Sequence, residues 1–337
     1  MPEGTAFLTL PLFEQSEILN DLAQKLGRSA QVLEKDIWVC WTLDRLFSIP
    51  NAKPMAFKGG TSLSKAYRVI ERFSEDVDVT LDLREPTDFN PFTKGLSKSQ
   101  LNNYSKVLKQ RLKDYTETIL LPHFQRSLKD TGEGTGRVEV VDSGLYIYYP
   151  TQHTHVNEYI QPQVFLELGA RNAAVPTERV TLQADVAFKA PQGLVFPTAT
   201  VDVLMIERTF WEKATLIHAA CLLGELKIGA ERISRHWFDL VQLDRVGITE
   251  QAMGTPNLLE DVVRYKQTFF KQSHDRDYHD CLNRAFQLVP ETIMLKQLET
   301  DYDKMVSARM LYGQSPVFSN LLESVQSIQD RLNRTPI

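Results

Sequence analysis

Two carboxylates in one short segment are the residues of this sequence best suited to do chemistry. Asp76 and Asp78 stand two positions apart in the run DVDVTLDL, where polar and apolar residues alternate strictly. This alternation predicts a β-strand, because successive side chains of a strand point to opposite faces. Both carboxylates then lie on one face and can share a divalent cation such as Mg²⁺. A solvated strand face shows the same pattern, so the pair needs support from its surroundings.

The segment before this strand can bind phosphate. Met55 to Phe57 is predicted to be a short strand, and the turn Gly59-Gly60-Thr61-Ser62 follows it. Backbone N–H groups where such a turn enters a helix, together with a Thr or Ser hydroxyl, can bind a triphosphate. The spacing of four apolar residues predicts that helix, with one shared face: Leu63, Ala66, Tyr67 and Ile70.

Two charged residues beside the acidic pair have alternative interpretations. Arg72 can contact a phosphate, or it can pair with Glu71 or Glu75 on its own helix. Asp82 continues the acidic face but lies about 6–7 Å beyond Asp78 along the strand. We therefore expect Asp82 to be solvated.

The elements that must position these residues can be predicted along the chain. Two helices precede the site, at residues 13–28 and 30–47, and Ser29 is the expected N-cap of the second. Residues 137–187 are rich in strands, and from residue 208 onward the pattern is almost wholly helical. The sequence thus predicts an α+β protein. We expect three parts, namely a helical segment at 1–50, an α/β core at 51–206 and a helical domain at 207–337.

Composition limits the class of protein. At 337 residues the chain is long enough for two or three structural units, and its formal net charge of −5 argues against a generally basic nucleic-acid coat. Cys40, Cys221 and Cys281 are far apart and form no C-x-x-C pair, which argues against a disulfide framework or a thiolate zinc site. No window approaches the ~20 apolar residues that span a bilayer. We expect a cytoplasmic protein that does not associate with a membrane.

The glycine turn and the acidic strand together resemble the first motif of the AbiEii/AbiGii toxin family. These toxins are nucleotidyltransferases of the DNA polymerase β-like superfamily and include the MenT toxins. The resemblance rests on Gly59-Gly60-Thr61-Ser62, on Lys65 and on the run from Arg72 to Asp78. It extends over about residues 30 to 320 through four further segments: Glu34 to Val39, Arg208 to Lys213, Ser234 to Leu240, and Asp301-Tyr302 with Met305 and Tyr312-Gly313.

The resemblance implies how a nucleotide is held. Asp76 and Asp78 would bind one or two Mg²⁺ ions. The four turn residues would cradle the β- and γ-phosphates: Gly59, Gly60, Thr61 and Ser62. The implied fold is a polymerase β-like mixed sheet flanked by N-terminal helices, with a helical C-terminal half that closes the nucleotide cleft.

Three more residues receive roles from the same resemblance. Lys213 would neutralise phosphate charge, and Asp239 would complete the site from the helical half. Glu167 is the candidate for a third carboxylate on a neighbouring strand, and Asp185 is the alternative. Relatives often carry a Lys-Asp pair where this chain has Arg235-His236, so the role of that position stays open.

The implied activity is transfer of a nucleoside monophosphate from an NTP to an acceptor hydroxyl, by in-line attack on the α-phosphate with pyrophosphate leaving. The implied acceptor is the 3′ end of tRNA. The protein would then be the toxin of a bacterial toxin–antitoxin or abortive-infection system, neutralised by a cognate antitoxin encoded nearby. Two alternatives stay open, namely nucleotidylation of a protein hydroxyl and a catalytically silent module that binds nucleotide or RNA.

Overall fold

The computed structural model describes residues 4–74, 76–132, 136–153, 161–226, 232–270, 278–308, 310–312 and 316–334. The chain forms two compact units. The first comprises Met1–Ala66, Glu75–Arg84 and Val107–Val203, and the second comprises Tyr67–Ser74, Glu85–Lys106 and Leu204–Ile337. The three-part division with boundaries after residues 50 and 206 stays a prediction.

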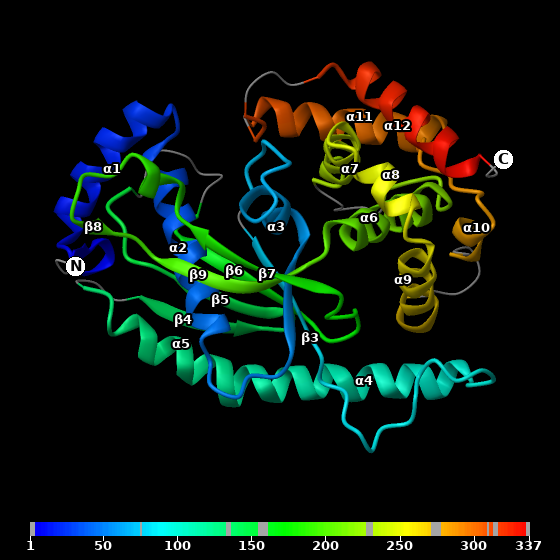
Figure 1. Ribbon diagram of the computed structural model, residues 1–337, viewed down its shortest axis with the longest axis horizontal. Coiled ribbons are helices and arrows are strands. Elements are labelled where there is room, and N and C mark those ends of the chain that lie inside the picture. The colour runs from blue at the N-terminus through cyan, green and yellow to red at the C-terminus, as the bar shows by residue number, and fades with distance from the viewer. Residues whose placement is uncertain are drawn as a thin grey trace. The chain divides into compact units, whose positions relative to one another are not determined.

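A mixed sheet dominates the first unit (Figure 1). Within the described residues it has seven strands in the order β4-β5-β6-β3-β2-β9-β7. The bounds of these strands are β2 Met55–Lys58, β3 Asp76–Leu81, β4 Arg137–Val141, β5 Gly144–Tyr148, β6 Gln163–Gly169, β7 Thr177–Gln183 and β9 Thr198–Leu204. Strand β3 runs antiparallel to β2 and parallel to β6, whereas β5 runs antiparallel to β4 and β6. The predicted α+β class with a mixed sheet is confirmed.

The N-terminal helices form as the sequence predicts. They are α1 (Leu12–Leu26) and α2 (Ala30–Phe47), and the Ser29 hydroxyl caps α2 by accepting a hydrogen bond from the Val32 amide at 3.3 Å. Helix α2 packs against β3, β6 and β7. Its apolar side chains are buried, as are Val77 and Val79 on the alternate positions of β3. Burial of one strand face leaves Asp76 and Asp78 on the opposite face.

The helix after the glycine turn is shorter than the sequence predicts. Helix α3 spans only Gly59–Lys65. In the second unit, Arg68 adopts a φ of 54°, and the Phe73 amide donates to the Met310 carbonyl at 2.7 Å. The backbone of this segment therefore bonds to a distant part of the chain instead of continuing the helix. The predicted helical face was wrong for Tyr67 and Ile70.

The remaining elements of the first unit are short. They are β1 (Thr5–Ala6), η1 (Phe7–Thr9), the π-helix η2 (Thr116–Leu120), α5 (Leu121–Leu128), η3 (Asp185–Phe188) and β8 (Leu194–Val195). Helix α4 (Lys98–Tyr115) contributes residues to both units.

The second unit is built from helices, as predicted for the C-terminal half. Its helices are α6 (Ile206–Cys221), α7 (Arg235–Arg245), α8 (Ile248–Met253), α9 (Pro256–Phe269), α10 (His279–Leu282), α11 (Thr292–Ser307) and α12 (Phe318–Asn333). Helix α6 packs against α7, α8 and α9, and α12 packs against α7. Among the described helices, none is long and apolar enough to cross a membrane.

Candidate active site

Gly59 brings the turn and the acidic strand into close contact. It starts α3 directly after β2 and has a φ of +79°, a left-handed conformation that costs other residues free energy. Its neighbour Lys58 pairs with Asp78 across the antiparallel strands β2 and β3. A Cβ atom on Gly59 would lie 2.0 Å from Asp78 Oδ2. Glycine at this position therefore lets the Asp78 carboxylate lie against the backbone of the turn.

The two hydroxyl residues of the turn hold its shape. Thr61 Oγ1 donates a hydrogen bond to the Asp76 carbonyl oxygen, and Ser62 Oγ donates to the Gly59 carbonyl oxygen at 2.9 Å. Both side chains are buried. The Thr61 bond ties α3 to the start of β3, because Asp76 carries the first carboxylate, and the Ser62 bond closes the turn on itself. The predicted phosphate contacts of Thr61 and Ser62 stay a prediction.

Glu167, the predicted third carboxylate of the site, lies beside Asp76 and Asp78. Parallel strands β3 and β6 pair Asp76 with Phe165 and Asp78 with Glu167, so these side chains share one face of the sheet. Glu167 is exposed as a residue, but its carboxyl group is partly buried beside Asp78. Partial burial of that group, followed by the charge and hydrogen bond of Asp78, raises the pKa of Glu167 to about 7.

A divalent cation suits the neighbouring carboxylates of Asp78 and Glu167 chemically. Two crowded carboxylates repel each other, and a cation between them removes that repulsion. Within the described part of the chain, no three His, Cys, Asp or Glu side chains converge as a complete metal cage. Mg²⁺ does not need such a cage, since it usually takes one or two protein carboxylates, substrate phosphates and water. The donor set thus suits a Mg²⁺ ion.

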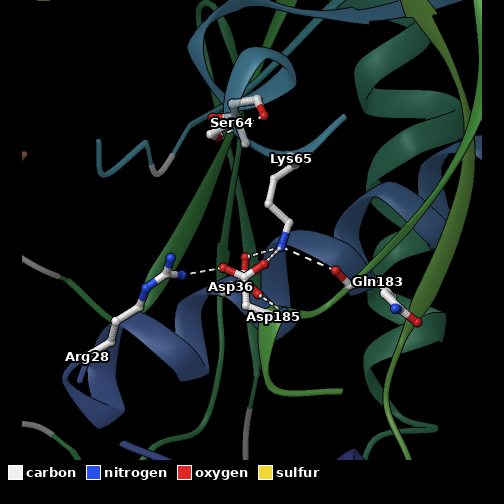
Figure 2. A network of polar contacts seen from close by, with 7 residues as sticks. Arg28, Asp36, Ser64, Lys65, Gln183 and Asp185 are labelled. Carbon is white, nitrogen blue, oxygen red and sulfur yellow. Dashed lines mark hydrogen bonds and ion pairs between the residues drawn. The ribbon is translucent and has the colours of Figure 1, made fainter. Parts of the chain in front are cut away.

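Asp185, the alternative third carboxylate, belongs to a different cluster (Figure 2). Lys65 Nζ lies 2.6 Å from Asp36 Oδ1 and 2.8 Å from Asp185 Oδ1. Arg28 Nη1 pairs with Asp185 Oδ2, and the Asp185 amide donates to Asp36 Oδ2 at 2.7 Å. The same Lys65 ammonium donates to the Gln183 carbonyl oxygen at 3.3 Å. Asp185 is engaged by two cations, whereas Glu167 is the carboxylate paired with Asp78.

This half-buried cluster anchors the far end of α3. Burial would lower the pKa of Lys65, but the charges of Asp36 and Asp185 outweigh it and raise that pKa. The charges of Lys65 and Arg28 lower the pKa of Asp185 against the opposing effect of burial. Lys65 is therefore held as a cation between α2 and η3. Since Lys65 ends the helix that Gly59 begins, the cluster helps to fix the glycine turn.

Three predicted residues meet in the second unit. Arg72 holds Asp239 in a bidentate pair, with Nε at 2.6 Å from Oδ1 and Nη2 at 2.8 Å from Oδ2. Lys213 Nζ lies 2.8 Å from the same Oδ2, and all three side chains are buried. Burial would raise the pKa of Asp239, but Arg72 and Lys213 lower it well below its usual range. Arg72 thus binds a carboxylate here, and its predicted phosphate contact stays a prediction.

The Arg235-His236 position adds a neutral ring to this cluster. Burial, followed by the positive charges of Lys213 and Arg235, lowers the pKa of His236 well below its usual value. Its Nδ1 is buried and has no hydrogen-bond partner among the described groups. The ring is therefore uncharged near neutral pH. Burial also lowers the pKa of Lys213, and the charge of Asp239 offsets part of that effect.

Comparison with known proteins decides the family. The family of nucleotidyl transferase AbiEii toxins, which belong to type IV toxin–antitoxin systems, matches residues 41–325. The chain belongs to the AbiEii family. It is therefore a nucleotidyltransferase, as its motifs predict. Membership also implies an NTP substrate and a cognate antitoxin for this AbiEii protein.

Two solved structures match the AbiEii chain at low similarity. MenT4, a nucleotidyltransferase toxin from Mycobacterium tuberculosis H37Rv, is 15% identical with a TM-score of 0.42, over 94% of this chain and 99% of MenT4. JHP933 from Helicobacter pylori is 15% identical with a TM-score of 0.40, over 96% of this chain and 94% of JHP933. None of the curated proteins matches the chain. Membership in the family therefore rests on the match to residues 41–325.

The structure groups the predicted AbiEii site residues into two sets. Gly59, Asp78 and Glu167 meet in the first unit, and Arg72, Lys213 and Asp239 meet in the second. The motifs include Lys65, Asp36, Arg72 and Asp239, but sequence reasoning missed their pairing because no local pattern specifies partners so distant along the chain. Two motif residues, Glu75 and Gly313, lie outside the described residues.

Proposed function

We propose that this AbiEii protein transfers a nucleoside monophosphate from an NTP to the 3′ end of tRNA in a Mg²⁺-dependent reaction. One observation carries the proposal. Asp78 and Glu167 occupy paired positions on neighbouring strands, and the Asp78 carboxylate lies against Gly59 of the turn. Carboxylates beside a glycine turn are suited to hold a divalent cation, which would supply charge stabilisation for a triphosphate.

The site residues of the first unit would have different roles in the reaction. Asp76 and Asp78 would hold Mg²⁺, which supplies charge stabilisation for the phosphates when it is bound. The Gly59-Gly60 backbone would position the β- and γ-phosphates. The acceptor hydroxyl oxygen bonds to the α-phosphorus, the bond from that phosphorus to the bridging oxygen breaks, and pyrophosphate leaves. Glu167 is the proposed acceptor of the hydroxyl proton.

Lys213 is the proposed cation of the second unit. Its ammonium is held by Asp239, and Arg72 shares that carboxylate. One buried anion between two cations leaves a net positive charge, which suits a group that acts on phosphate. Asp239 would then orient Lys213 rather than contact the metal. NTPs and tRNA are both cytoplasmic, and we place the reaction in that compartment.

The proposal is tested by supplying each α-labelled NTP with Mg²⁺ and either total tRNA or total cellular protein. We expect label on tRNA, loss of transfer when EDTA removes the metal, and recovery when Mg²⁺ is restored. Label on protein alone would show that the acceptor is a protein hydroxyl rather than tRNA. No transfer to either would contradict the proposed reaction.

Single substitutions of aspartates test which carboxylates hold the metal. We expect Asp76→Asn and Asp78→Asn to lose at least about 100-fold in transfer, because each removes a ligand charge from the metal. Asp82→Asn is the control, since Asp82 follows the same strand but pairs with Arg84, with Nη2 and Oδ2 2.5 Å apart. Full activity of Asp78→Asn, or an equal loss in Asp82→Asn, would show that the metal site is elsewhere.

A further inference from the structure

Three aromatic side chains lie beside the carboxylates on the sheet, and we call them the aromatic strip: Tyr146, Tyr148 and Phe165. The Tyr146 and Phe165 rings stack with centroids 4.7 Å apart and planes at 27°. The Tyr148 ring follows with its centroid 6.1 Å from that of Tyr146. All three side chains are half-buried, whereas the alternate positions of the same strands are buried: Leu145, Ile147, Val164 and Leu166. The strip is therefore not part of the core face.

Strand register places the strip on the same face as the carboxylates. Phe165 of β6 pairs with Asp76 of β3, and Tyr146 of β5 pairs with Phe165. Strands β3, β6 and β5 are direct neighbours in the sheet (Figure 1). A row of side chains therefore runs from Asp76 across Phe165 to Tyr146. Neighbouring strands are about 4.8 Å apart, so the row spans about 10 Å.

A cation marks the far end of the strip. Arg137 of the edge strand β4 pairs with Tyr148, and its guanidinium carbon lies 3.6 Å from the centroid of the Tyr148 ring. The Arg137 side chain is 61% exposed and also contacts Glu139 at 2.9 Å. An exposed guanidinium over an aromatic ring offers both a stacking plane and a phosphate contact.

We propose that the aromatic strip binds the unpaired bases of the RNA acceptor and that Arg137 contacts its phosphate backbone. This inference rests on the proposed function. Proteins bind single-stranded RNA by stacking its bases on aromatic rings and Arg planes and by meeting its phosphates with cations. Three strand spacings separate β3 from β4, so Arg137 lies about 14 Å from the Asp76 position. A triphosphate held at Asp76 and Asp78 would not reach that cation, whereas a polynucleotide carries further phosphates, which favours the acceptor over the NTP as the occupant.

The geometry gives the acceptor a direction. The end of the strip at Phe165 adjoins Asp76, a proposed metal ligand, so the terminal nucleotide would lie there. The preceding nucleotides would stack on Tyr146 and Tyr148, and Arg137 would meet the backbone further from the reacting hydroxyl. Recognition by stacking tolerates different bases, so the strip would position an unpaired end without reading its sequence.

Fluorescence anisotropy with a labelled short single-stranded RNA, in the absence of NTP, tests the proposal on the full chain. We expect Phe165→Leu and Tyr148→Leu each to weaken RNA binding about tenfold, since each removes a stacking ring. Phe165→Trp, which keeps a ring, should bind like the wild type. Phe13→Leu is the matched control, because Phe13 is 60% exposed on a different element of the same unit. Thermal unfolding verifies that each variant is folded.

Two further binding measurements distinguish the possible occupants of the aromatic strip. A blunt-ended RNA duplex has no unpaired bases, so its affinity should not change in the Leu variants. The affinity for NTP with Mg²⁺ should also be unchanged. Unaltered binding of single-stranded RNA by Phe165→Leu would overturn the proposal. A loss confined to NTP binding would overturn it as well, because the strip would then serve the nucleotide.

The transfer assay separates this proposal from the proposed function. If the wild type labels tRNA and the Leu variants bind RNA normally, only the assignment of the strip fails. If the wild type labels protein instead, the proposed function fails, and the strip loses its RNA acceptor with it.

Discussion

Gly59→Ala is expected to abolish most nucleotidyl transfer while the protein stays folded. The added Cβ would lie 2.0 Å from Asp78 Oδ2, and ordinary contact begins at 3.4 Å. The carboxylate must therefore move by more than 1 Å, since the methyl group is fixed to the backbone of the turn. A displacement of about 1 Å in an active site can cost about 100-fold in rate, and we expect a loss of at least that size in kcat/KM.

The same substitution also strains the backbone, and a second glycine isolates that effect. Gly193 has a φ of +87°, close to the +79° of Gly59, and no described atom lies within 4 Å of a Cβ built there. Alanine in this left-handed region costs about 1–2 kcal/mol at either position. Gly193→Ala should therefore lose stability by a similar amount, with its transfer activity unchanged.

Two measurements decide the outcome. Labelled-NTP transfer to the acceptor that the wild type uses gives kcat/KM, and urea unfolding gives the free energy of each variant. Retention of activity by Gly59→Ala within about threefold would refute the role given to the Asp78 position, because the predicted displacement costs far more. An equal loss of activity in Gly193→Ala would show that backbone strain, rather than displacement of Asp78, is the cause.

Three further substitutions follow from buried charges, each measured by urea unfolding. The pKa of Glu34 is raised from 4.5 to about 7, mainly by burial, so the folded protein keeps a proton that the unfolded chain releases, and stability falls as pH rises between these values. Glu34→Gln should then be up to about 3 kcal/mol more stable than the wild type at mildly alkaline pH, the two curves should converge in acid, and parallel curves would contradict the assignment. Lys65→Met leaves Asp36 and Asp185 without their shared cation and should cost about 3–5 kcal/mol, whereas Lys25→Met, which breaks the exposed pair with Asp21, should cost under about 1 kcal/mol. Asp239→Asn should destabilise the protein by about 3–5 kcal/mol and reduce transfer; Asp202→Asn, which breaks an exposed pair with Arg179 at 3.6 Å, is its control, and equal effects of the two would refute the importance of the buried cluster.

The sequence by itself determined those features that depend on local chemistry. Strict alternation predicts that Asp76 and Asp78 share a strand face, because the period of a strand is two residues. A glycine pair between a strand and a helix predicts a turn that other residues enter at a cost, and Gly59 adopts that conformation. The N-terminal helices and the helical second half follow from their apolar spacing, and the motif resemblance predicts the AbiEii family that the comparison confirms.

Tertiary structure alone decided which charged groups meet. Glu167 faces Asp78, and Phe165 faces Asp76, only because β3 and β6 pair in parallel with one particular register. A shift of one residue would turn Glu167 to the core face. Asp185 looked equally acidic in the sequence, yet Lys65 and Arg28 bind it. Arg72 likewise forms its ion pair with Asp239, which is distant along the chain. Such pairings depend on burial and on strand register between distant segments, which local residue patterns do not specify.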